Sequence, residues 1–348
     1  MKSSTSTTID DVARLAGVSI KTVSRVVNRE PNVRASTQEK VAAAIKQLNY
    51  TPNQSARNLA SHRSRFVGLI YDDPSAFELP SSGYITRLQE GSLRACRAAQ
   101  YELLIHPCNY RSRRVDEELK ALIEQVRPAG MIIAAPLSNM PRVVNAIQDT
   151  GTAFVRLAPG TNNTDEFIVA TNDREVSAQM THYLASLGHT RIAFIAGHKR
   201  HKAVAQRRQG FKDALNELAL TVPGRFFEQG DNSIGSGERC AERLLSKSNP
   251  PTAIFAANDD MAAGVLRTAL RHGIKVPEQL SIAGCDDIAL CQQLYPTLTT
   301  IRQPLAAMAD RAASVLIQDK RAGTVSIGNE IIPAELKIRE STGPVPSR

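Results

Sequence analysis

The residues with the most specific chemistry lie in a short segment near the N-terminus. Lys21 and Arg25 are four positions apart, so on a helix they share one face, and either side chain can donate to O6 and N7 of guanine. Ile20 beside them can contact the methyl group of thymine. Hydroxyl and amide side chains of the same segment can donate to phosphate groups: Ser19, Thr22, Ser24 and Asn28. This combination predicts a helix that reads bases in the major groove of DNA, and the alternative is a small helical bundle with a solvated polar face.

A helix-turn-helix is predicted to position these side chains. The sequence Thr-Ile-Asp-Asp at residues 8–11 is a capping box, and it predicts a first helix that ends near Ala16. Gly17 permits the tight turn, and Ser19 can cap a second helix over residues 20–28.

A third helix and a linker are predicted to follow. A second capping box at residues 36–39 predicts a helix that ends near Tyr50 and Pro52. The polar stretch 53–65 then has few apolar residues, which is typical of a linker with one or two marginal helical turns.

Positive charge is concentrated in this front part of the chain. The 348 residues carry a net charge of +9. Residues 1–65 hold 11 basic and four acidic side chains, hence +7, whereas the other 283 residues carry only +2. A basic front on a nearly neutral body indicates a polyanionic partner that is held at one end, and the alternative is a solvated basic tail.

The pattern changes from residue 66 onward. Short apolar runs alternate with helical segments of ten or more residues, at residues 66–71, 101–105, 130–135, 152–157, 167–170, 191–196, 253–257 and 280–284. Strands of continuous apolar character that alternate with helices predict parallel sheets covered on both faces. Eight such strands exceed one doubly wound domain, so we expect two α/β halves with a ligand cleft at the carboxyl ends of their strands.

Other classes of protein lack support in the sequence. The first eight residues are polar, and no apolar run approaches the roughly 18 residues of a membrane span, so we expect a cytoplasmic protein without a membrane partner. The five cysteines are scattered without a C-x-x-C pair, so reduced thiols and no zinc site are expected. We found none of the motifs G-x-S-x-G, G-x-x-x-x-G-K-[ST], G-x-G-x-x-G and H-E-x-x-H, so no catalytic residue, metal or cofactor is expected. A secreted transport protein would share the body but would have no use for residues 1–60.

The front segment resembles the headpiece signature of the lactose-repressor (LacI) family. The matching residues 8–28 are TIDDVARLAGVSIKTVSRVVN. The match continues at residues 48–53 and 56–59, and it resumes in the body at residues 257–259, 284–287 and 298–304. The resemblance therefore covers essentially the whole chain.

This resemblance implies a transcriptional regulator, most often a repressor, that binds a palindromic operator as a dimer. Ile20, Lys21 and Arg25 match the base-reading positions. The positions near phosphate are matched by Thr8, Ser19, Thr22, Ser24, Asn28, Tyr50 and Asn53. Ala56 and Leu59 match the family's hinge helix, whose leucine wedges into the minor groove at the operator centre.

The resemblance also implies the domain organisation. The fold class is an all-α helix-turn-helix headpiece followed by a two-lobed, doubly wound parallel α/β core like that of periplasmic binding proteins. The implied parts are a headpiece at 1–51, a hinge helix or linker at 52–65, and an effector-binding and dimerisation domain at 66–348, with lobe 1 at about 66–170 plus 303–333 and lobe 2 at about 172–300 plus 334–348. The last residues, 343–348, have no leucine heptads, so a homodimer is expected.

The expected effector is a small molecule, by default a carbohydrate, that acts as an inducer or a corepressor. Arg207 and Asp286 match the family's ligand-clamping arginine and acidic contact, and the alternative is a structural ion pair. Further candidates near strand ends are Asp73, Arg156, Asp173 and Asn258. The basic loop 197–202 could favour an anionic effector, and the alternative is a solvated surface loop.

Overall fold

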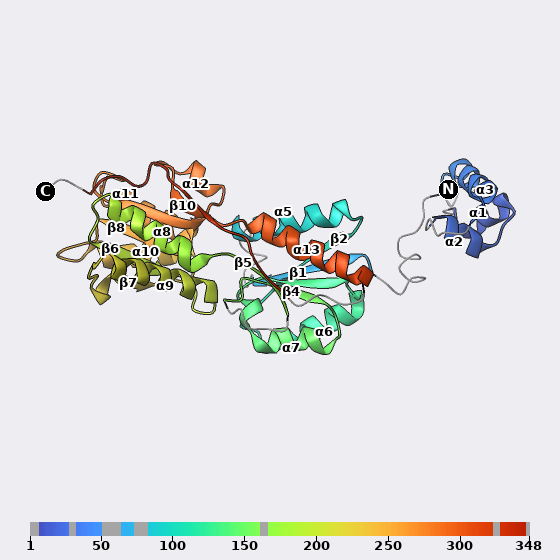
Figure 1. Cartoon of the computed structure of the whole chain (residues 1–348), viewed down its shortest axis with the longest axis horizontal. Coiled ribbons are helices and arrows are strands. Elements are labelled where there is room, and N and C mark those ends of the chain that lie inside the picture. The colour runs from blue at the N-terminus through green and yellow to red at the C-terminus, as the bar shows by residue number, and fades with distance from the viewer. Residues whose placement is uncertain are drawn as a thin grey trace, which may run out of the picture. The chain divides into compact units, whose positions relative to one another are not determined.

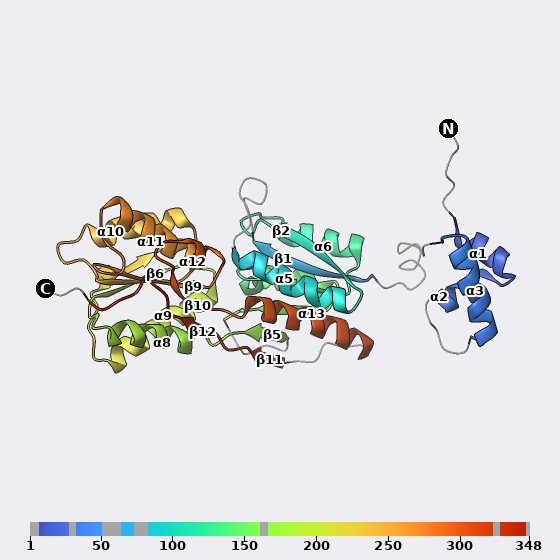
Figure 2. The same cartoon turned by 90° about the horizontal axis from the view of Figure 1, so that it is seen from above.

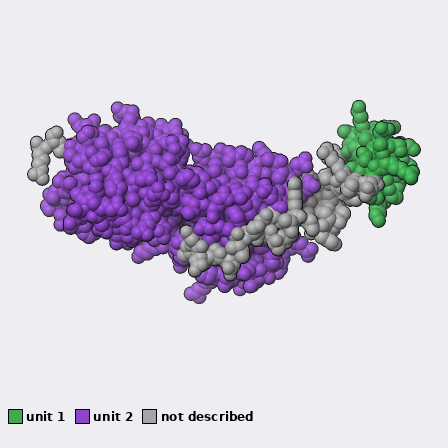
Figure 3. All heavy atoms as spheres, in the orientation of Figure 1, with its two compact units in different colours: residues 1–64 green, residues 65–348 purple. Residues whose placement is uncertain are grey.

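The computed structural model describes residues 7–27, 33–50, 64–72, 83–160, 166–322 and 328–345, without the side chains of 319–322. The chain divides into two compact units, residues 1–64 and residues 65–348 (Figure 3). None of the helices in these ranges is long and apolar enough to cross a membrane.

The first unit holds three short helices, α1 (Ile9–Ala16), α2 (Ile20–Val27) and α3 (Ala35–Gln47) (Figure 1). The predicted capping box begins α1, because the Asp11 backbone N–H donates to the Thr8 hydroxyl and the Thr8 N–H donates to the Asp11 carboxylate. Gly17 then adopts the left-handed conformation, with φ of 65°, which a residue with a side chain adopts at a cost. The helix-turn-helix prediction is confirmed.

The predicted start of the third helix is wrong. Helix α3 begins at Ala35, and its N-cap Arg34 accepts the first intrahelical bonds from the N–H groups of Thr37 and Gln38. Ser36 therefore lies within the first turn, where its hydroxyl cannot act as the N-cap. The Gln38 amide instead donates to the carbonyl of Val33, which lies outside the helix.

A small core holds the three helices together. Its completely or almost completely buried members are Val12, Ala13, Val23, Val41 and Ala44. They come from all three helices, so the apolar spacing of the sequence translates directly into this contact.

The first lobe of the second unit is a parallel sheet in the order β11-β5-β4-β3-β1-β2. Its strands are β1 (Phe66–Asp72), β2 (Glu102–Cys108), β3 (Gly130–Ile133), β4 (Phe154–Leu157), β5 (Phe167–Ala170) and β11 (Gly328–Ile331). Its helices are α5 (Gly83–Ala98), α6 (Val115–Val126), α7 (Pro141–Asp149) and α13 (Leu305–Ala322), and the short turn η1 (Leu137–Asn139) precedes α7.

Helices cover both faces of this sheet. The pair α5 and α13 lies side by side on one face, and α6 and α7 lie on the other (Figures 1 and 2). Successive strand residues alternate between the two layers: Leu69 packs in the core under α5 and α13, while Ile70 packs in the core with α6 and α7. This two-sided burial explains the continuous apolar runs of the sequence.

The second lobe has a sheet in the order β12-β10-β9-β8-β6-β7, in which only the β10–β12 pair of the described strands is antiparallel. Its strands are β6 (Ile192–Ala196), β7 (Phe227–Gln229), β8 (Ala253–Ala256), β9 (Ser281–Asp286), β10 (Thr299–Arg302) and β12 (Glu335–Lys337). Its helices are α8 (Asp173–Ser186), α9 (Lys202–Glu217), α10 (Ile234–Leu245), α11 (Asp259–Arg271) and α12 (Leu290–Gln293), with the 3₁₀ turn η2 (Gly224–Phe226) before β7.

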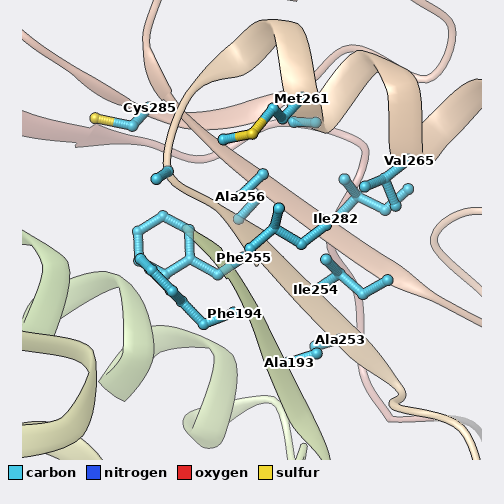
Figure 4. Close-up of a cluster of buried hydrophobic side chains, with 14 of the residues drawn as sticks. Ala193, Phe194, Ala253, Ile254, Phe255, Ala256, Met261, Val265, Ile282 and Cys285 are labelled. Carbon is cyan, nitrogen blue, oxygen red and sulfur yellow. The ribbon is translucent and has the colours of Figure 1, made fainter. Parts of the chain in front are cut away.

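The core of the second lobe is built on aromatic contacts (Figure 4). Phe194 and Phe255 are completely buried on neighbouring strands, with ring centroids 5.3 Å apart in an edge-to-face arrangement. Ile282 and Met261 pack into the same cluster. Burial of each such side chain contributes about 1.5–3 kcal/mol to the free energy of folding.

The two-lobed parallel α/β prediction is confirmed, and all eight predicted strands are present. Four strands lacked a signal in the sequence: β7, β10, β11 and β12. The reason is visible in β11, whose residues alternate between partial burial and exposure, and in β7 and β12, which have three residues each. Such short edge strands owe their pairing to tertiary contacts rather than to apolar character.

Candidate DNA-reading surface and ligand pocket

Helix α2 of the first unit presents the predicted base-reading residues. Val23 is completely buried and holds one face of α2 against the small core. Ile20 on the outer side is 47 % exposed although it is apolar, and Lys21 is exposed as well. Arg25 follows one turn later and is half-buried. Ile20 and Lys21 are therefore accessible for contact with base edges.

The predicted phosphate contacts differ in how their side chains are occupied. The hydroxyl groups of Ser19 and Thr22 lie 2.9 Å apart, and the Ser19 hydroxyl also accepts from the Thr22 backbone N–H. The Thr8 hydroxyl donates to the Asp11 carboxylate at 2.8 Å as part of the cap. Tyr50 is half-buried and packs against the small core.

Ser24 is half-buried on α2. Five further predicted site residues lie outside the described residues, namely Asn28, Asn53, Ala56, Leu59 and Asp73.

A pocket of about 190 Å³ lies between the two lobes of the second unit, at the carboxyl ends of their strands. From the first lobe it is lined by Asp72, Tyr84, Ile85, Ala135, Pro136 and Ala158. From the second lobe it is lined by His198, His201, Ala203, Val204, Arg207, Asp231, Asn232, Asn258, Asp260, Asp286 and Gln303. Residues from both lobes that converge on one small polar cavity are typical of a ligand site at a topological switch point.

Arg207 is the central group of the pocket. It is 5 % exposed, its Nε donates to Asp173 Oδ1 at 2.7 Å, and its Nη1 donates to the carbonyl of Ala257 at 2.6 Å. Its Nη1 also lies 4.0 Å from Asp286 Oδ1. The guanidinium is therefore locked in position with part of its surface directed at the cavity, which suits it to bind ligand oxygen atoms.

The packing of α8 against α9 places this arginine. Gly210 lies one turn after Arg207, and a Cβ at this position would overlap the carbonyl oxygen of Arg174. The Ser177 hydroxyl donates to the Arg207 carbonyl at 2.7 Å across the same contact. Because glycine permits this close approach, α9 comes near enough to α8 for Arg207 to reach Asp173.

Asp286 is held in a strained conformation at the end of β9. Its φ is 130°, in a region that residues with side chains rarely adopt, and Gln303 donates to its carboxylate. Burial raises the pKa of Asp286 well above its usual range, although the charge of Arg207 opposes this shift. Strain of this kind persists where the surrounding structure fixes it, and it is common in ligand sites.

Burial also shifts the pKa of other groups that line the pocket. Burial, and then the charge of Asp259, raise the pKa of Asp260 to about 6. Burial, and then the nearby charges of His198 and Arg207, lower the pKa of His201 to about 3. Burial followed by the charge of Asp286 raises the pKa of Tyr84, so its hydroxyl keeps its proton. The pocket thus offers hydrogen-bond donors and acceptors around the Arg207 guanidinium, which already faces two carboxyl groups. Asp231 adds a negative charge to the lining, because the effect of its burial is outweighed by hydrogen bonds from Ser233, which lower its pKa.

The structure brings only some of the predicted effector residues into the lining. Arg207, Asn258 and Asp286 line the pocket. Asp173 lies behind Arg207 and positions it. The Asn258 side chain is engaged on both sides, since its Oδ1 accepts from the Met261 N–H and its Nδ2 donates to the Asn232 carbonyl.

Arg156 does not reach the pocket lining. Its guanidinium points into the first lobe, where Nε donates to the Ser138 carbonyl at 2.8 Å and Nη1 pairs with Glu166 at 2.6 Å. The sequence places Arg156 toward the end of a strand, as expected for a pocket residue. Its side chain nevertheless turns away from the pocket toward the Ser138 carbonyl and Glu166.

Several lining residues had no signal in the sequence. Tyr84 and Gln303 belong to segments that approach the pocket only after the lobes assemble. His198 and His201 come from the basic loop 197–202, which the sequence singled out for its charge and not as individual lining residues. His198 Nε2 lies 2.7 Å from the Tyr110 hydroxyl, which belongs to the other lobe.

Comparison with known proteins agrees with both parts of this arrangement. Residues 8–53 match the family model described as bacterial regulatory proteins of the lacI family, and residues 181–342 match a periplasmic binding protein-like domain. The HTH-type transcriptional repressor PurR of Vibrio cholerae is 32 % identical over 316 residues, which cover 89 % of this chain and 90 % of that protein. The ribose operon repressor of Escherichia coli is 31 % identical over 312 residues, or 89 % of this chain and 92 % of that protein.

Solved structures give the same result for the fold. A Lac repressor dimer bound to operator and the anti-inducer ONPF is similar with a TM-score of 0.82 and 27 % identity, over 97 % of this chain and 99 % of that chain. A complex of the transcriptional regulator CelR with cellobiose gives a TM-score of 0.74 and 27 % identity, over 96 % of this chain and 99 % of that chain.

A helix-turn-helix unit joined to a two-lobed domain with an inter-lobe pocket defines a DNA-binding transcriptional regulator with an effector-binding domain, and not an enzyme. The chain belongs to the LacI family of bacterial regulatory proteins. The resemblance noted in the sequence is thereby confirmed.

Proposed function

We propose that this regulator represses its target genes as a homodimer on a palindromic operator, and that a small carbohydrate in the inter-lobe pocket controls its affinity for DNA. The observation that carries the proposal is the pocket itself, in which a buried arginine and a strained aspartate from the second lobe meet residues of the first. As a bacterial DNA-binding protein it acts in the cytoplasm, where the DNA is.

The pocket chemistry favours a neutral polyhydroxylated ligand. Each sugar hydroxyl both donates and accepts, which matches a lining that mixes Arg207 with the carboxyl groups of Asp286 and Asp260. A volume of about 190 Å³ is below the ~300 Å³ of typical pockets for drug-sized ligands, so the ligand is small. The relatives agree in kind, since one regulates a ribose operon and one was solved with cellobiose.

In the first unit, Ile20, Lys21 and Arg25 are proposed to read bases. Thr8, Ser19, Thr22, Ser24, Asn28, Tyr50 and Asn53 are proposed to fix the register on phosphates. The Lac repressor structure, which is a dimer bound to operator, supports this assignment. In the hinge, Ala56 and Leu59 are proposed to pack in the minor groove and to kink the operator centre.

The coupling between the two units is proposed to run through closure of the lobes. A ligand that contacts Arg207 and Asp286 of one lobe together with Tyr84 of the other stabilises a closed arrangement. In a dimer this changes the separation of the two hinge segments, and hence their ability to seat on DNA. The coupling free energy of such a mechanism is typically about 1–3 kcal/mol, and it is reciprocal: operator DNA must change effector affinity by the same factor.

The proposal is tested by selecting bound DNA from the source genome, and then titrating sugars against the protein on that DNA by fluorescence anisotropy. We expect a palindrome and a sugar that shifts operator affinity. We expect Asp286→Asn to weaken the effect of that sugar at least about 10-fold, or 1.4 kcal/mol, without loss of operator binding. The matched control Asp213→Asn changes a half-buried carboxylate of α9 outside the pocket lining and should leave the sugar response unchanged. Salt-sensitive binding without a palindrome would refute the proposal of a palindromic operator. An unchanged sugar response in Asp286→Asn would refute the proposal that the sugar binds in the inter-lobe pocket.

A further inference from the structure

A second cavity lies beside the ligand pocket, and its chemistry is different. We name it the basic groove: it has a volume of about 760 Å³ and is lined, in the described part of the chain, by Tyr110, Arg111, Asn139, Met140, Pro141, Arg142, Lys199, Arg200 and Lys202. Five of these nine residues are Lys or Arg, and none is Asp or Glu. Arg111 and Arg142 come from the first lobe, whereas the three other cations come from the loop 197–202 and the first residue of α9 in the second lobe.

Within the described part of the chain, direct ion pairs do not neutralise these positive charges. No ion pair among the described residues includes any of the five cations of the basic groove. Arg142 donates to the backbone carbonyls of Tyr110 and Ser112, and Arg111 donates to the Tyr110 hydroxyl, so their hydrogen bonds go to neutral acceptors. The carboxylates of Asp72 and Asp231 in the ligand pocket attract Arg111 electrostatically, but neither forms a direct ion pair with it.

The backbone adds to the positive potential. Helices α7 and α9 both begin at the basic groove, with Pro141 and Lys202 as their first residues. Neither helix has a side-chain cap at this end. The N-terminus of a helix carries about half a positive elementary charge, and it binds anions through its outward N–H groups.

An unsatisfied polar side chain points to a ligand here. Both the oxygen and the nitrogen of the Asn139 amide are buried without a hydrogen-bond partner, and Asn139 lines the basic groove. A buried amide without partners costs about 1–3 kcal/mol, and a ligand group that bonds to it would remove this cost. The amide nitrogen can donate to an anion oxygen, and the amide oxygen can accept from a ligand hydroxyl.

We propose that the basic groove is an anion subsite that binds a phosphate group of a small molecule next to the ligand pocket. The inference rests on the proposed function, because it adds a charged moiety to the effector chemistry of the same cleft. Phosphate suits the groove because its oxygens can accept from guanidinium, ammonium and helix N–H groups at once. Tyr110 of the groove and His198 of the pocket are in contact at 2.7 Å, so the two cavities adjoin, and the proposal is that a sugar ring and its phosphate ester occupy both.

This placement has a mechanical consequence. The two lobes present like charges to each other across the groove, which opposes closure while the groove is empty. A phosphate between Arg142 of one lobe and Lys199 or Lys202 of the other converts that repulsion into attraction. The anion therefore stabilises the closed arrangement, in the same direction as a sugar that bridges the lobes in the pocket.

The test uses the full-length protein and isothermal titration calorimetry at constant ionic strength, with inorganic phosphate, ribose, ribose 5-phosphate, glucose and glucose 6-phosphate as probes. We expect phosphate binding that the double variant Lys199→Gln/Lys202→Gln weakens at least 10-fold. The control double variant Lys212→Gln/Lys275→Gln removes two exposed lysines from the same lobe, outside the groove, and should bind as the natural sequence does. Asn139→Leu should also weaken phosphate binding while leaving the melting temperature unchanged or higher, which a purely structural asparagine would not do.

The probes distinguish the two sources of phosphate. A sugar phosphate that binds more tightly than its parent sugar, with the advantage removed in Lys199→Gln/Lys202→Gln, means that one molecule spans pocket and groove. Binding of inorganic phosphate that persists in Asp286→Asn means that the groove holds a separate anion. Phosphate compounds that bind the groove variant as well as the natural sequence would overturn the inference. The response to a neutral sugar is read separately, so that result would leave the proposed function of the pocket standing.

Discussion

Two ion pairs between helices α8 and α9 allow a direct measurement of how burial changes the contribution of an ion pair to stability. Arg207 pairs with Asp173 at 2.7 Å, and both side chains are less than 10 % exposed. Arg174, the next residue after Asp173, pairs with Asp213 at 2.5 Å, and its side chain is 60 % exposed. The two ion pairs thus join the same two helices at nearly the same N–O distance, but they differ in their exposure to water.

The expected effects on the free energy of unfolding differ accordingly. Arg207→Met leaves the Asp173 carboxylate buried without its partner, and the loss of one member of a buried pair costs about 3–5 kcal/mol. Arg174→Met removes a pair whose arginine is 60 % exposed to water, and such a pair contributes about 0–1 kcal/mol. The double variant Arg207→Met/Asp173→Leu should recover part of the loss, because Asp173 no longer remains unpaired, although Asp286, 4.0 Å from the guanidinium, still lacks its facing charge.

The pH dependence of the buried pair follows from the same reasoning. Burial raises the pKa of Asp173 even though Arg207 opposes this shift. Without Arg207 the pKa rises further, so the carboxyl takes up a proton as the pH falls and escapes the unpaired state. The penalty of Arg207→Met should therefore be largest at neutral pH and should shrink as the pH falls into the acid range.

The assay is urea denaturation of the full chain, followed by circular dichroism at several pH values with midpoints and slopes compared. Equal losses in Arg207→Met and Arg174→Met would contradict the assigned difference in burial. A double variant that is no more stable than Arg207→Met would show that the arginine acts through its packing rather than through its charge.

Three further results are expected. Arg25→Ala should weaken binding to the specific operator by about 1–3 kcal/mol and relax base preference at one position, as read by selection and sequencing of bound DNA; a uniform loss on all sequences would make it a phosphate contact. Leu59→Ala, which rests on the family resemblance, should weaken specific binding strongly and non-specific binding little in anisotropy titrations, whereas equal losses would exclude the wedge. His189 is completely buried, and its ring nitrogens form hydrogen bonds with Thr252 and Ser281. Burial is the main reason why the pKa of His189 is lowered. Its stabilisation is fully present above about pH 6.5 and declines as the pH falls below that value, by up to about 1.4 kcal/mol per pH unit. His189→Gln should flatten this part of the pH profile of unfolding, and an unchanged slope would assign the dependence to other groups.

The sequence alone predicted the parts of this protein that local rules govern. The capping box of Thr8 and Asp11, the turn at Gly17 and the apolar spacing around Val23 each act within a few residues, and together they predicted the helix-turn-helix. Eight strands were predictable because burial on both faces of a parallel sheet requires continuous apolar runs. The family followed from motifs spread over the whole chain.

Only the tertiary structure decided which side chains share a cavity. Arg156 on β4 and Arg207 on α9 were both predicted to line the pocket, yet Arg156 turns to the Ser138 carbonyl while Arg207 faces Asp286. The direction of a side chain depends on the acceptors that distant segments bring near it, and these acceptors lie far away in the sequence.

The basic groove shows the same division. The sequence revealed the cationic loop 197–202, but Arg142 and the unsatisfied Asn139 come from another lobe, some 60 residues earlier. Charge is additive along a chain, so it can be read from composition. The field at one point depends on distances between segments, which only the packing of the two lobes determines.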